Sequence, residues 1–329
     1  MIVFLISQNQ QIQAGDIVEN YKGATVLVTG ATGFLAMHLI PALVDKGAKI
    51  VGMSMEKNYN PNIKNFSYIN ADLKDKKSLN EEIKKIKPKI IFHLAAYPDN
   101  EPSFENTDNC IQNNIQGALN LIHSLADTGF ESFIHIGSYK EYSGTEIPFK
   151  ETDAVFPISS YAISKACAEM FCKAYHKIYG LPIVLLRLPT VYGSGQSDQN
   201  LIPYLIKSSI AGKPLKLTKG EQKRELIYVS DVIDALLKAG ASKEARGEIM
   251  NIGTGKEYTL KEIVGMVLSL TNSKTKPKWG AIPYRKSEIW QMRGDNSKAK
   301  CILKWEPKTS MEDGLIKTIA SYKNDSGKD

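Results

Sequence analysis

A glycine-rich turn between an apolar segment and an amphipathic segment constrains the fold of this chain most strongly. The sequence GATGFLA occupies residues 30–36, after the apolar residues 24–28 and before a helical pattern that ends near residue 46. Gly30 permits a tight turn, Gly33 lets the backbone approach a pyrophosphate, and the amides at the start of the helix face the anion. The segment predicts a strand, a turn and a helix around a dinucleotide, which is flanked by Gly30, Thr32, Gly33, Phe34 and Leu35.

The first half of the chain alternates short apolar runs with helical patterns. Five runs are predicted strands: residues 24–28, 49–53, 90–94, 132–136 and 183–186. Strands that alternate with helices form a parallel sheet with right-handed crossovers. We therefore expect an α/β fold with a Rossmann-like, doubly wound parallel sheet, followed by a smaller C-terminal substrate-binding lobe.

The second half has a looser pattern and suggests how the chain divides. After Pro189 the sequence breaks into short segments separated by glycine and proline. We expect a dinucleotide-binding domain over residues 21–189, to which residues of about 225–255 return, and a mainly substrate-binding lobe over residues 190–329. Residues 1–20 form an N-terminal extension to which the sequence assigns no role.

The composition narrows the class of protein. The chain has 329 residues, 43% of them hydrophobic, which is enough for a sizeable core, and no stretch approaches the length of a membrane span. Its four cysteines show no metal-ligand spacing, so we expect reduced thiols and no metal site. The net charge of +7 is spread along the chain. We expect a cytoplasmic protein that binds neither membranes nor nucleic acid.

A tyrosine and a lysine four residues apart form the second strong pattern. Tyr161 and Lys165 fall on one face of a predicted helix. The ammonium group can lower the pKa of the phenol, which can then pass a proton to or from a substrate oxygen during hydride transfer at the adjacent carbon. Ser138 follows a predicted strand and can hydrogen-bond the same oxygen. Asn114 lies in a helix, where it could stabilise a kink or a water relay.

Further motifs follow the glycine-rich turn along the chain. They are the Asp72-Leu73 pair, HLAA at 93–96, NNIQGALNLI at 113–122, GSYKEYSG at 137–144, YAISK at 161–165, RLPTVYG at 187–193, NLIPY at 200–204 and KRELIYVSDV at 223–232. Together with the glycine-rich turn, they resemble the extended short-chain dehydrogenase/reductase family, in its NAD-dependent epimerase/dehydratase branch that modifies nucleotide sugars. The resemblance covers roughly residues 22–322.

The resemblance implies roles for individual residues. Ser138, Tyr161 and Lys165 match the catalytic triad, and Asn114 matches an asparagine often added to it. Beyond the glycine-rich turn, the implied cofactor residues are Ser54, Lys57, Asp72, Leu73, Leu94, Ala95, Ala96, Tyr161 and Lys165. The implied substrate residues are Ser138, Tyr139, Asn200, Leu201, Arg224 and Arg285. The two arginines would grip the substrate diphosphate, because guanidinium groups bind such oxygens bidentately.

The residues after the catalytic serine bear on the reaction. Sugar-nucleotide dehydratases of this branch usually carry an acidic residue in the two positions after the catalytic Ser or Thr. In this chain those positions are Tyr139 and Lys140. Elimination needs a general acid, so dehydratase activity is disfavoured. Glu141 next to Tyr142 instead resembles the EYG ending of several reductases of 4-keto-6-deoxy sugars. Thr190 stands where many members of the family have asparagine, so the sequence does not identify the hexose of the substrate.

Ser54, after the second strand, bears on the cofactor. An aspartate at that position would accept a hydrogen bond from the ribose 2′-hydroxyl and repel a 2′-phosphate, whereas Ser54 with Lys57 nearby does neither. NADP(H) is therefore the expected cofactor. NAD(H) is the alternative, because Glu56 could replace the missing carboxylate.

These observations lead to one expected function and two alternatives. We expect an NAD(P)H-dependent reductase of a nucleotide-diphosphate keto sugar of the 4-keto-6-deoxy type. An NAD-dependent nucleotide-sugar epimerase uses the same triad and is the alternative, and a noncatalytic dinucleotide sensor represents a different class. The apolar helices near residues 110–128 and 161–180 match those of a four-helix dimer interface in relatives, so we expect a homodimer.

Overall fold

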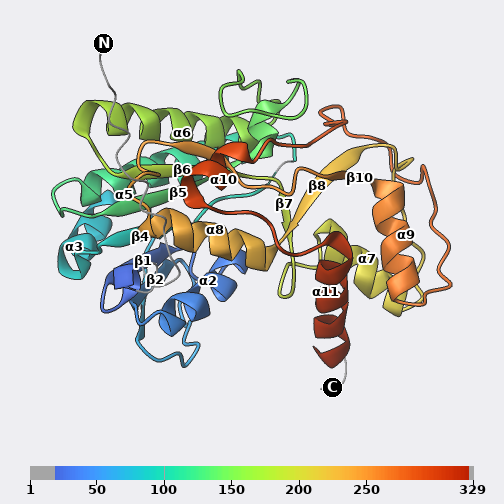
Figure 1. The fold of residues 1–329 in the computed structure, drawn as a ribbon, viewed down its shortest axis with the longest axis horizontal. Helices are drawn as coiled ribbons and strands as arrows, with labels where there is room; N and C mark the ends of the chain where they lie inside the picture. Colours follow the sequence, from blue (N-terminus) through green and yellow to red (C-terminus); the bar gives the residue numbers. More distant parts are fainter. Residues whose placement is uncertain (1–18, 100, 326–329) are drawn as a thin grey trace, which may run out of the picture.

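A parallel sheet of seven strands organises the structure, a computed structural model that describes residues 19–99 and 101–325 (Figure 1). The strands are β1 (Thr25–Thr29), β2 (Lys49–Ser54), β3 (Phe66–Asn70), β4 (Ile90–His93), β5 (Ser132–Ser138), β6 (Ile183–Leu188) and β9 (Ile249–Asn251). Their order is β3-β2-β1-β4-β5-β6-β9, which confirms the doubly wound α/β class. The order reverses between β1 and β4, where sheets of this kind bind ligands beyond the carboxyl ends of the strands.

The predicted strands correspond to β1, β2, β4, β5 and β6, because each contains a long apolar run that the sheet buries. Two strands of this seven-stranded sheet, β3 and β9, were not predicted. β3 lies at the sheet edge and leaves every residue at least partly exposed, so its sequence carries a weak apolar pattern. β9 has only three residues, although all three are buried. Most of the N-terminal extension, residues 1–18, lies outside the described residues.

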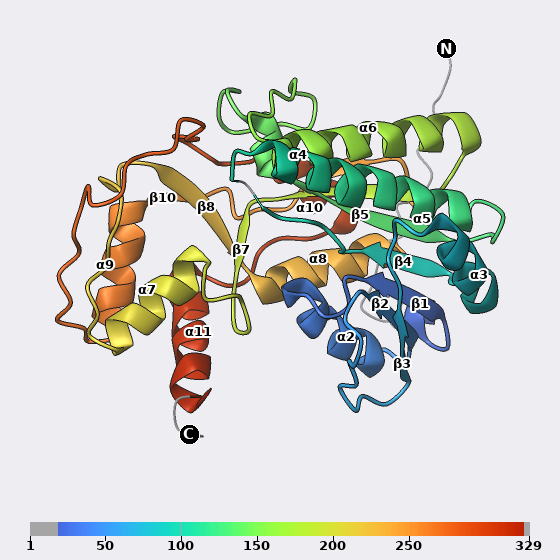
Figure 2. The same cartoon turned by 180° about the vertical axis from the view of Figure 1, so that it is seen from behind.

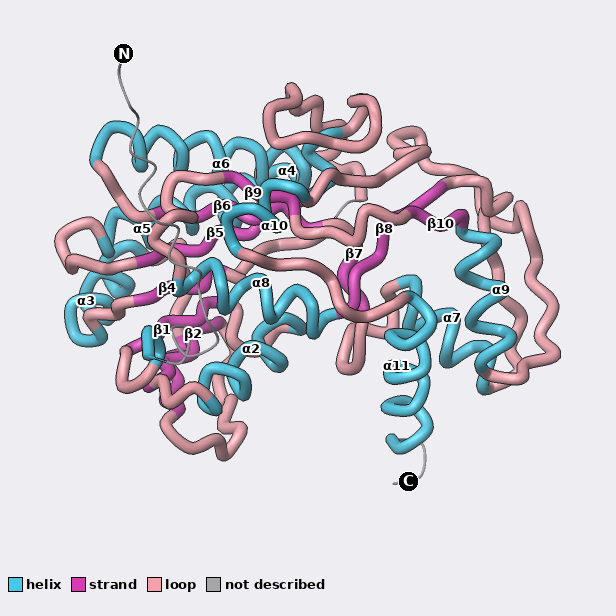
Figure 3. The backbone as a smooth tube through the Cα atoms, in the orientation of Figure 1, coloured by secondary structure: helices cyan, strands magenta, loops and turns pink. Residues whose placement is uncertain are grey.

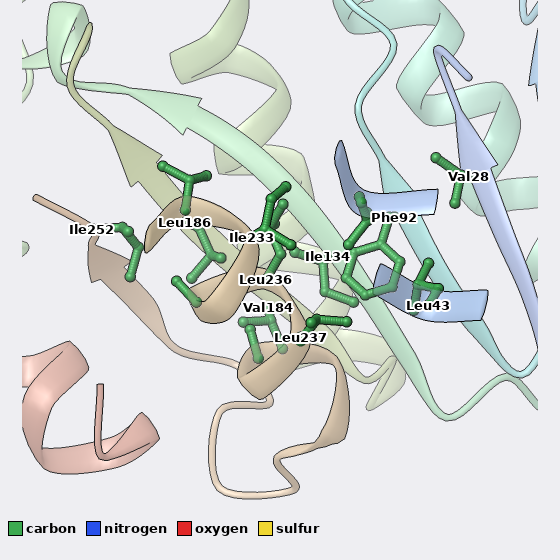
Figure 4. Packing of buried hydrophobic residues seen from close by; sticks show 14 of the residues in the cluster. Val28, Leu43, Phe92, Ile134, Val184, Leu186, Ile233, Leu236, Leu237 and Ile252 are labelled. Atoms are coloured by element: carbon green, nitrogen blue, oxygen red, sulfur yellow. The ribbon is translucent and has the colours of Figure 1, made fainter. Parts of the chain in front are cut away.

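Helices cover both faces of the sheet (Figures 1 and 2). One layer contains α2 (Phe34–Asp45), α8 (Val229–Ala241) and α10 (Ser297–Leu303). The other contains α3 (Lys76–Ile86), α4 (Phe104–Cys110), the π-helix η1 (Ile111–Gln116), α5 (Gly117–Leu125) and α6 (Ser160–Tyr179). In the first layer, Leu236 and Leu237 of α8 lie close to Ile134 and Val184 of the sheet (Figure 4). Each such buried side chain contributes about 1.5–3 kcal/mol of transfer free energy.

The two ends of α6 are fixed by local interactions. Ser159 caps the first turn, because its hydroxyl accepts a hydrogen bond from the amide of Ala162 at 3.2 Å. Gly180 ends the helix with φ of 66°, a left-handed conformation that glycine adopts without steric cost. Tyr161 and Lys165 therefore lie in the first two turns of a helix with a defined start.

A smaller lobe follows β6 (Figure 3). Its three-stranded sheet contains β7 (Thr190–Tyr192), β8 (Lys223–Tyr228) and β10 (Glu257–Thr259), and its helices are α7 (Leu201–Ile210), α9 (Leu260–Leu270) and α11 (Met311–Asp325). These elements bury a separate apolar core. α8 packs on the large sheet, β9 pairs with its strand β6 and α10 packs against β9, whereas β8 stays in the lobe. We keep the division after residue 189 as a proposal, with α10 added to the returning segments.

The four cysteines are free thiols, and Cys110 and Cys172 are buried. Within residues 19–99 and 101–325, no group of three or more His, Cys, Asp and Glu side chains is arranged to hold a metal ion. No helix in the same ranges is long and apolar enough to cross a membrane.

Candidate active site

The first of two cavities lies beyond the carboxyl ends of β1, β2 and β4 and has a volume of about 290 Å³. We call it the glycine-turn cavity. Gly30 has φ of 66°, and a Cβ atom there would lie 2.8 Å from the amide nitrogen of Ala95, so only glycine fits. The predicted cofactor residues that line the cavity are Gly30, Thr32, Gly33, Ser54, Asp72, Leu73, Leu94, Ala95 and Ala96.

The helix after the turn points its first amides to the same cavity. Gly33 is the N-cap of α2, so Phe34 and Leu35 are the first two helical residues. Their side chains are half-buried against the apolar core and line neither cavity. Their contribution to an anion site is therefore limited to backbone amides at the helix N-terminus.

Ser54 and the turn after it form one wall of the glycine-turn cavity. The Ser54 hydroxyl lies 2.6 Å from the Tyr68 hydroxyl, which donates a 2.7 Å hydrogen bond to the backbone oxygen of Glu56. These contacts hold the turn in place. Glu56 lines the cavity, whereas Lys57 is exposed and lies outside its lining. The structure thus places Glu56, and not Lys57, beside the predicted adenosine site.

The second cavity, of about 510 Å³, is lined by the lobe and by residues that follow β5. We call it the lobe cavity. The predicted substrate residues that line it are Asn200, Leu201, Arg224 and Arg285, and Lys140 and Thr190 line it too. The Arg224 guanidinium donates to the Glu288 carboxylate and to the backbone oxygen of Ile289. Arg285 donates to Glu101 at 3.0 Å.

The exposures of the two arginines differ. The Arg224 side chain is 20% exposed, so Glu288 holds a largely desolvated cation in a fixed position. The Arg285 side chain is 62% exposed and lies at the rim. Both guanidinium groups have further N–H donors, and such groups bind phosphate oxygens bidentately.

The predicted catalytic residues come from β5 and α6, which pack against each other. Ser138 ends β5, and its hydroxyl accepts a 3.2 Å hydrogen bond from the amide of Lys140. The Lys140 ammonium nitrogen lies 5.5 Å from the centre of the Tyr161 ring. Ser138, Tyr161 and Lys165 line neither cavity themselves. Lys140 and Ser159 line the lobe cavity, and they are two residues from Ser138 and Tyr161 respectively, which places these two residues beside it. Lys165 is buried one helical turn beyond Tyr161.

Asn114 links the loop after β4 to α6. Its amide oxygen accepts from the amide of Tyr97 at 2.7 Å, and its amide nitrogen donates to the Tyr97 backbone oxygen at 3.0 Å and to the Ser164 hydroxyl at 2.9 Å. Ser164 donates in turn to the backbone oxygen of Tyr161. Asn114 also lies in the π-helix, so the sequence hypothesis of a helix irregularity at this residue agrees with the geometry.

Glu141 fixes the backbone at Ser138 through a buried hydrogen bond. It is fully buried, and its carboxylate accepts a 2.6 Å hydrogen bond from the Ser138 amide, which forms a capping box at the 3₁₀-helix η2 (Tyr139–Tyr142). Burial, and then the negative charge of Glu169, raise the pKa of Glu141 to about 8. Glu141 therefore has a structural position behind Ser138 and does not line the lobe cavity.

A buried ion pair lies next to Glu141. The Arg187 guanidinium of β6 donates to both carboxylate oxygens of Glu169 on α6, at 2.9 and 2.5 Å, and lies 3.7 Å from the Glu141 carboxylate. It also stacks at 4.5 Å over the Tyr142 ring. This cluster joins α6 to the central sheet directly behind the catalytic residues.

The ionisation of Tyr161 differs from the sequence prediction. Burial raises the pKa of the Tyr161 hydroxyl, and the nearby Glu141 carboxylate raises it further. The expected lowering by Lys165 is therefore wrong for this structure, because desolvation and Glu141 determine the direction of the shift. Burial also lowers the pKa of Lys165 to about 8, against the opposing effect of Glu141.

Comparison with known proteins decides the family. Residues 26–253, more than half of the chain, match the model of the NAD dependent epimerase/dehydratase family. This chain belongs to that family. The assignment confirms the expected enzyme class, that of the NAD-dependent epimerases and dehydratases.

The relatives of this epimerase/dehydratase family member include several 4-epimerases. The chain is 30% identical over 310 residues to the UDP-glucuronate 4-epimerase of Thermodesulfobacterium geofontis, which covers 89% of this chain and 94% of that protein. The UDP-glucose 4-epimerase of Thermotoga maritima, solved with UDP-glucose, has a TM-score of 0.86 at 27% identity and covers 92% and 99% of the two chains. The UDP-glucuronic acid 4-epimerase of Bacillus cereus, solved with UDP-glucuronic acid and NAD, has a TM-score of 0.84 at 28% identity and covers 91% and 99%.

One predicted substrate residue has a different place in this family member. Tyr139 is fully buried and packs against Tyr142 and Phe149, at ring-centre distances of 6.1 and 6.0 Å. The expected substrate contact of Tyr139 is therefore wrong, because the 3₁₀-helix turns this side chain into the core. Lys140, the next residue, reaches the lobe cavity instead.

Three further residues hold the site in place, although the sequence assigned them no role. Glu288 was not assigned a role, yet it fixes Arg224. Tyr68 was not assigned either, because its contact with Ser54 depends on the pairing of β2 with β3. Arg187 lies within the RLPTVYG motif, and a charged residue in an otherwise apolar strand was the signal for a buried ion pair.

Proposed function

We propose that the protein is an NAD-dependent epimerase that inverts carbon 4 of a nucleotide-diphosphate sugar. The observation that carries the proposal is the position of Ser138 and Tyr161 beside a cavity with two arginines, in a protein whose sheet has a dinucleotide-type cavity at its switch point. Lys165 follows Tyr161 by one helical turn. The 4-epimerases among the relatives favour this function over the reductase that the sequence suggested. Tyr139 and Lys140, in place of acidic residues, disfavour a dehydratase.

Each residue of the site has its own role in the proposed reaction. The residues that line the glycine-turn cavity would hold NAD, which would supply reversible hydride transfer at the sugar carbon. Tyr161 exchanges a proton with the sugar oxygen, and Lys165, on the same helix face, stabilises the phenolate while it exists. Ser138 orients that oxygen. Asn114 holds the first turn of α6 through Ser164, so that Tyr161 stays in place.

The lobe cavity supplies the proposed substrate contacts. Arg224 and Arg285 bind the diphosphate, because both guanidinium groups line the cavity and are held by carboxylates. Asn200 and Leu201 begin α7 and contact the nucleotide. Their place in the cavity supports the roles that the family resemblance implies.

We propose NAD, and not NADP, as the cofactor. The residues present fit a dinucleotide, since Gly30 forms a cradle at Ala95 that a Cβ atom would fill. Glu56 lines the cavity and can accept a hydrogen bond from a ribose hydroxyl, whereas a 2′-phosphate would meet its negative charge. Lys57 lies outside the lining, which removes the main reason for NADP.

Replacing Glu56 with glutamine is expected to weaken NAD binding by about 1–2 kcal/mol and to improve NADP binding, because a charged acceptor is replaced by a neutral amide. Isothermal titration with both cofactors measures the change. Glu105, an exposed acidic residue on α4, provides the control, and Glu105→Gln should leave both affinities unchanged. Tighter binding of NADP than of NAD to the unmodified protein would contradict the assignment.

We also propose that the protein is a homodimer. One side of α6 exposes apolar side chains with a seven-residue spacing, including Ile163, Met170, Phe171 and Ile178. α4 lies beside α6 (Figure 2), and its residue Phe104 is 93% exposed. A second copy of this helix pair would cover the surface in a four-helix arrangement.

The dimer should separate when a charge is placed in this surface. We expect light scattering of the unmodified protein to give about twice the 36.5 kDa chain mass, and Met170→Glu to give the chain mass alone. Ile316→Glu on α11, at a position that is 48% exposed, should stay dimeric. A monomeric unmodified protein at micromolar concentration would overturn the proposal.

The function itself is tested with the purified protein and no added cofactor. UDP-glucuronate and UDP-glucose are offered separately, and the products are separated by chromatography. An epimerase converts one of them to its C4 epimer without net oxidation or reduction. Consumption of NADPH with a 4-keto-6-deoxy nucleotide sugar, and no epimer, would instead establish the reductase.

A further inference from the structure

Lys140 holds an unusual position between the catalytic residues and the lobe cavity. Its amide is fixed by the Ser138 hydroxyl at 3.2 Å, its ammonium nitrogen lies 5.5 Å from the centre of the Tyr161 ring, and its side chain lines the cavity. Tyr161 must reach the oxygen on the reacting carbon. A cation at this distance from the tyrosine therefore lies within reach of a substituent close to that carbon.

The lobe cavity has more positive charge than a diphosphate requires. Among the described residues that line it, four are basic and one is acidic; they are Lys140, Lys216, Arg224, Arg285 and Glu288. Arg224 and Arg285 are the proposed diphosphate ligands, and Glu288 already pairs with Arg224. Lys140 and Lys216 are the other two basic residues of this lining, and they come from different parts of the fold. Lys216 belongs to the lobe, whereas Lys140 follows β5 beside the catalytic serine.

We propose that Lys140 binds a carboxylate on the sugar ring, so that the substrate is a nucleotide-diphosphate uronic acid. This inference rests on the proposed function, because it needs the sugar to lie between Tyr161 and the two arginines. A carboxylate on carbon 5 is separated from carbon 4 by two bonds. It can therefore meet the Lys140 ammonium group while Tyr161 contacts the oxygen on carbon 4.

The electrostatics of the site support an anionic partner for Lys140. Burial, and then the charges of Arg285 and Arg224, lower the pKa of Lys140 to about 8, against the opposing effect of Glu288. The ammonium form is thus destabilised in the free protein. A carboxylate would restore it through a charge-assisted hydrogen bond, which a neutral hydroxymethyl group cannot do.

The proposal is tested by binding, in a background where no product forms. Tyr161→Phe protein is titrated by calorimetry with UDP-glucuronate, UDP-glucose and UDP. We expect UDP-glucuronate to bind more tightly than UDP-glucose by roughly 10- to 100-fold, the usual range for one desolvated charged hydrogen bond. Lys140→Met should remove this preference, and Lys140→Arg should largely retain it.

Two controls separate the role of Lys140 from other effects. Lys216→Met should change the affinities for UDP-glucuronate and UDP-glucose by the same factor, because Lys216 lies in the lobe part of the cavity. UDP alone should bind equally well before and after Lys140→Met. A loss of UDP affinity would assign Lys140 to the diphosphate and overturn the proposal.

The same measurements distinguish a failure of the uronate assignment from a failure of the epimerase assignment. Equal affinities for the two sugars, or no binding of UDP-glucuronate, would overturn the uronate assignment whatever reaction the enzyme catalyses. Tight binding of UDP-glucuronate that depends on Lys140, with no C4 epimer formed by the unmodified protein, would support the binding site and contradict the epimerase. Circular dichroism of each variant shows whether it folds, and Lys140→Arg keeps the test valid if Lys140→Met does not.

Discussion

Replacing Tyr161 with phenylalanine is expected to lower turnover by about two to four orders of magnitude, because the site loses its general acid and base. The hydroxyl is the only group removed, and the Ser164 hydroxyl bonds the backbone oxygen of Tyr161 rather than its side chain, so folding and NAD binding should be nearly unchanged. Steady-state kinetics measures the loss. Near-ultraviolet absorbance of the purified protein measures the retained cofactor.

Tyr179 provides a matched control on the same helix. It is 67% exposed and lies at the far end of α6, so Tyr179→Phe should keep full turnover. Turnover of Tyr161→Phe within a few-fold of the unmodified protein would show that another group handles the proton. The assignment of Tyr161, and with it the position of the sugar, would then be wrong.

Replacing Arg187 with methionine is expected to lower the free energy of unfolding by about 3–5 kcal/mol, the usual cost of removing one partner of a buried ion pair. The Arg187 side chain is 3% exposed, and its loss leaves the Glu169 carboxylate, 4% exposed, without the cation that it contacts. Packing over the Tyr142 ring is lost as well. Urea denaturation followed by circular dichroism measures the change.

A double variant distinguishes the charge from the packing. Arg187→Met combined with Glu169→Met removes both charges and should recover a large part of the lost stability, since apolar residues often replace a buried pair at little cost. Lys85→Met, at an exposed ion pair with Glu82 on α3, should change stability by less than about 1 kcal/mol. If Arg187→Met lowers the free energy of unfolding as little as Lys85→Met does, the buried cluster does not hold α6 on the sheet.

Local sequence patterns predicted the parts of the fold that short segments determine. The glycine-rich turn specified its own geometry, because Gly30 needs a positive φ and a close approach to Ala95. The apolar runs that became β1, β4, β5 and β6 were visible because the sheet buries them on both faces. β3 was missed because an edge strand needs fewer apolar residues.

The errors and omissions concern the direction of single side chains. Tyr139 and Lys140 are neighbours in one turn, and the sequence does not show which of them faces the cavity; the capping box of Ser138 and Glu141 decides it. The choice between Glu56 and Lys57 at the glycine-turn cavity likewise depends on the contact of Tyr68 with the turn. The pKa of Tyr161 was predicted from Lys165 alone, whereas burial and Glu141 determine its direction. Such features depend on tertiary contacts, which a motif does not contain.

The most direct test of epimerisation through bound NAD follows the hydrogen on carbon 4. UDP-glucuronate that carries deuterium at carbon 4 is incubated in ordinary water with the purified protein and no added cofactor, and the product is examined by NMR and mass spectrometry. A hydride that leaves and returns within one site predicts the C4 epimer with its deuterium retained. Loss of deuterium to water, or the absence of epimer unless NADPH is added and consumed, would contradict the proposed function.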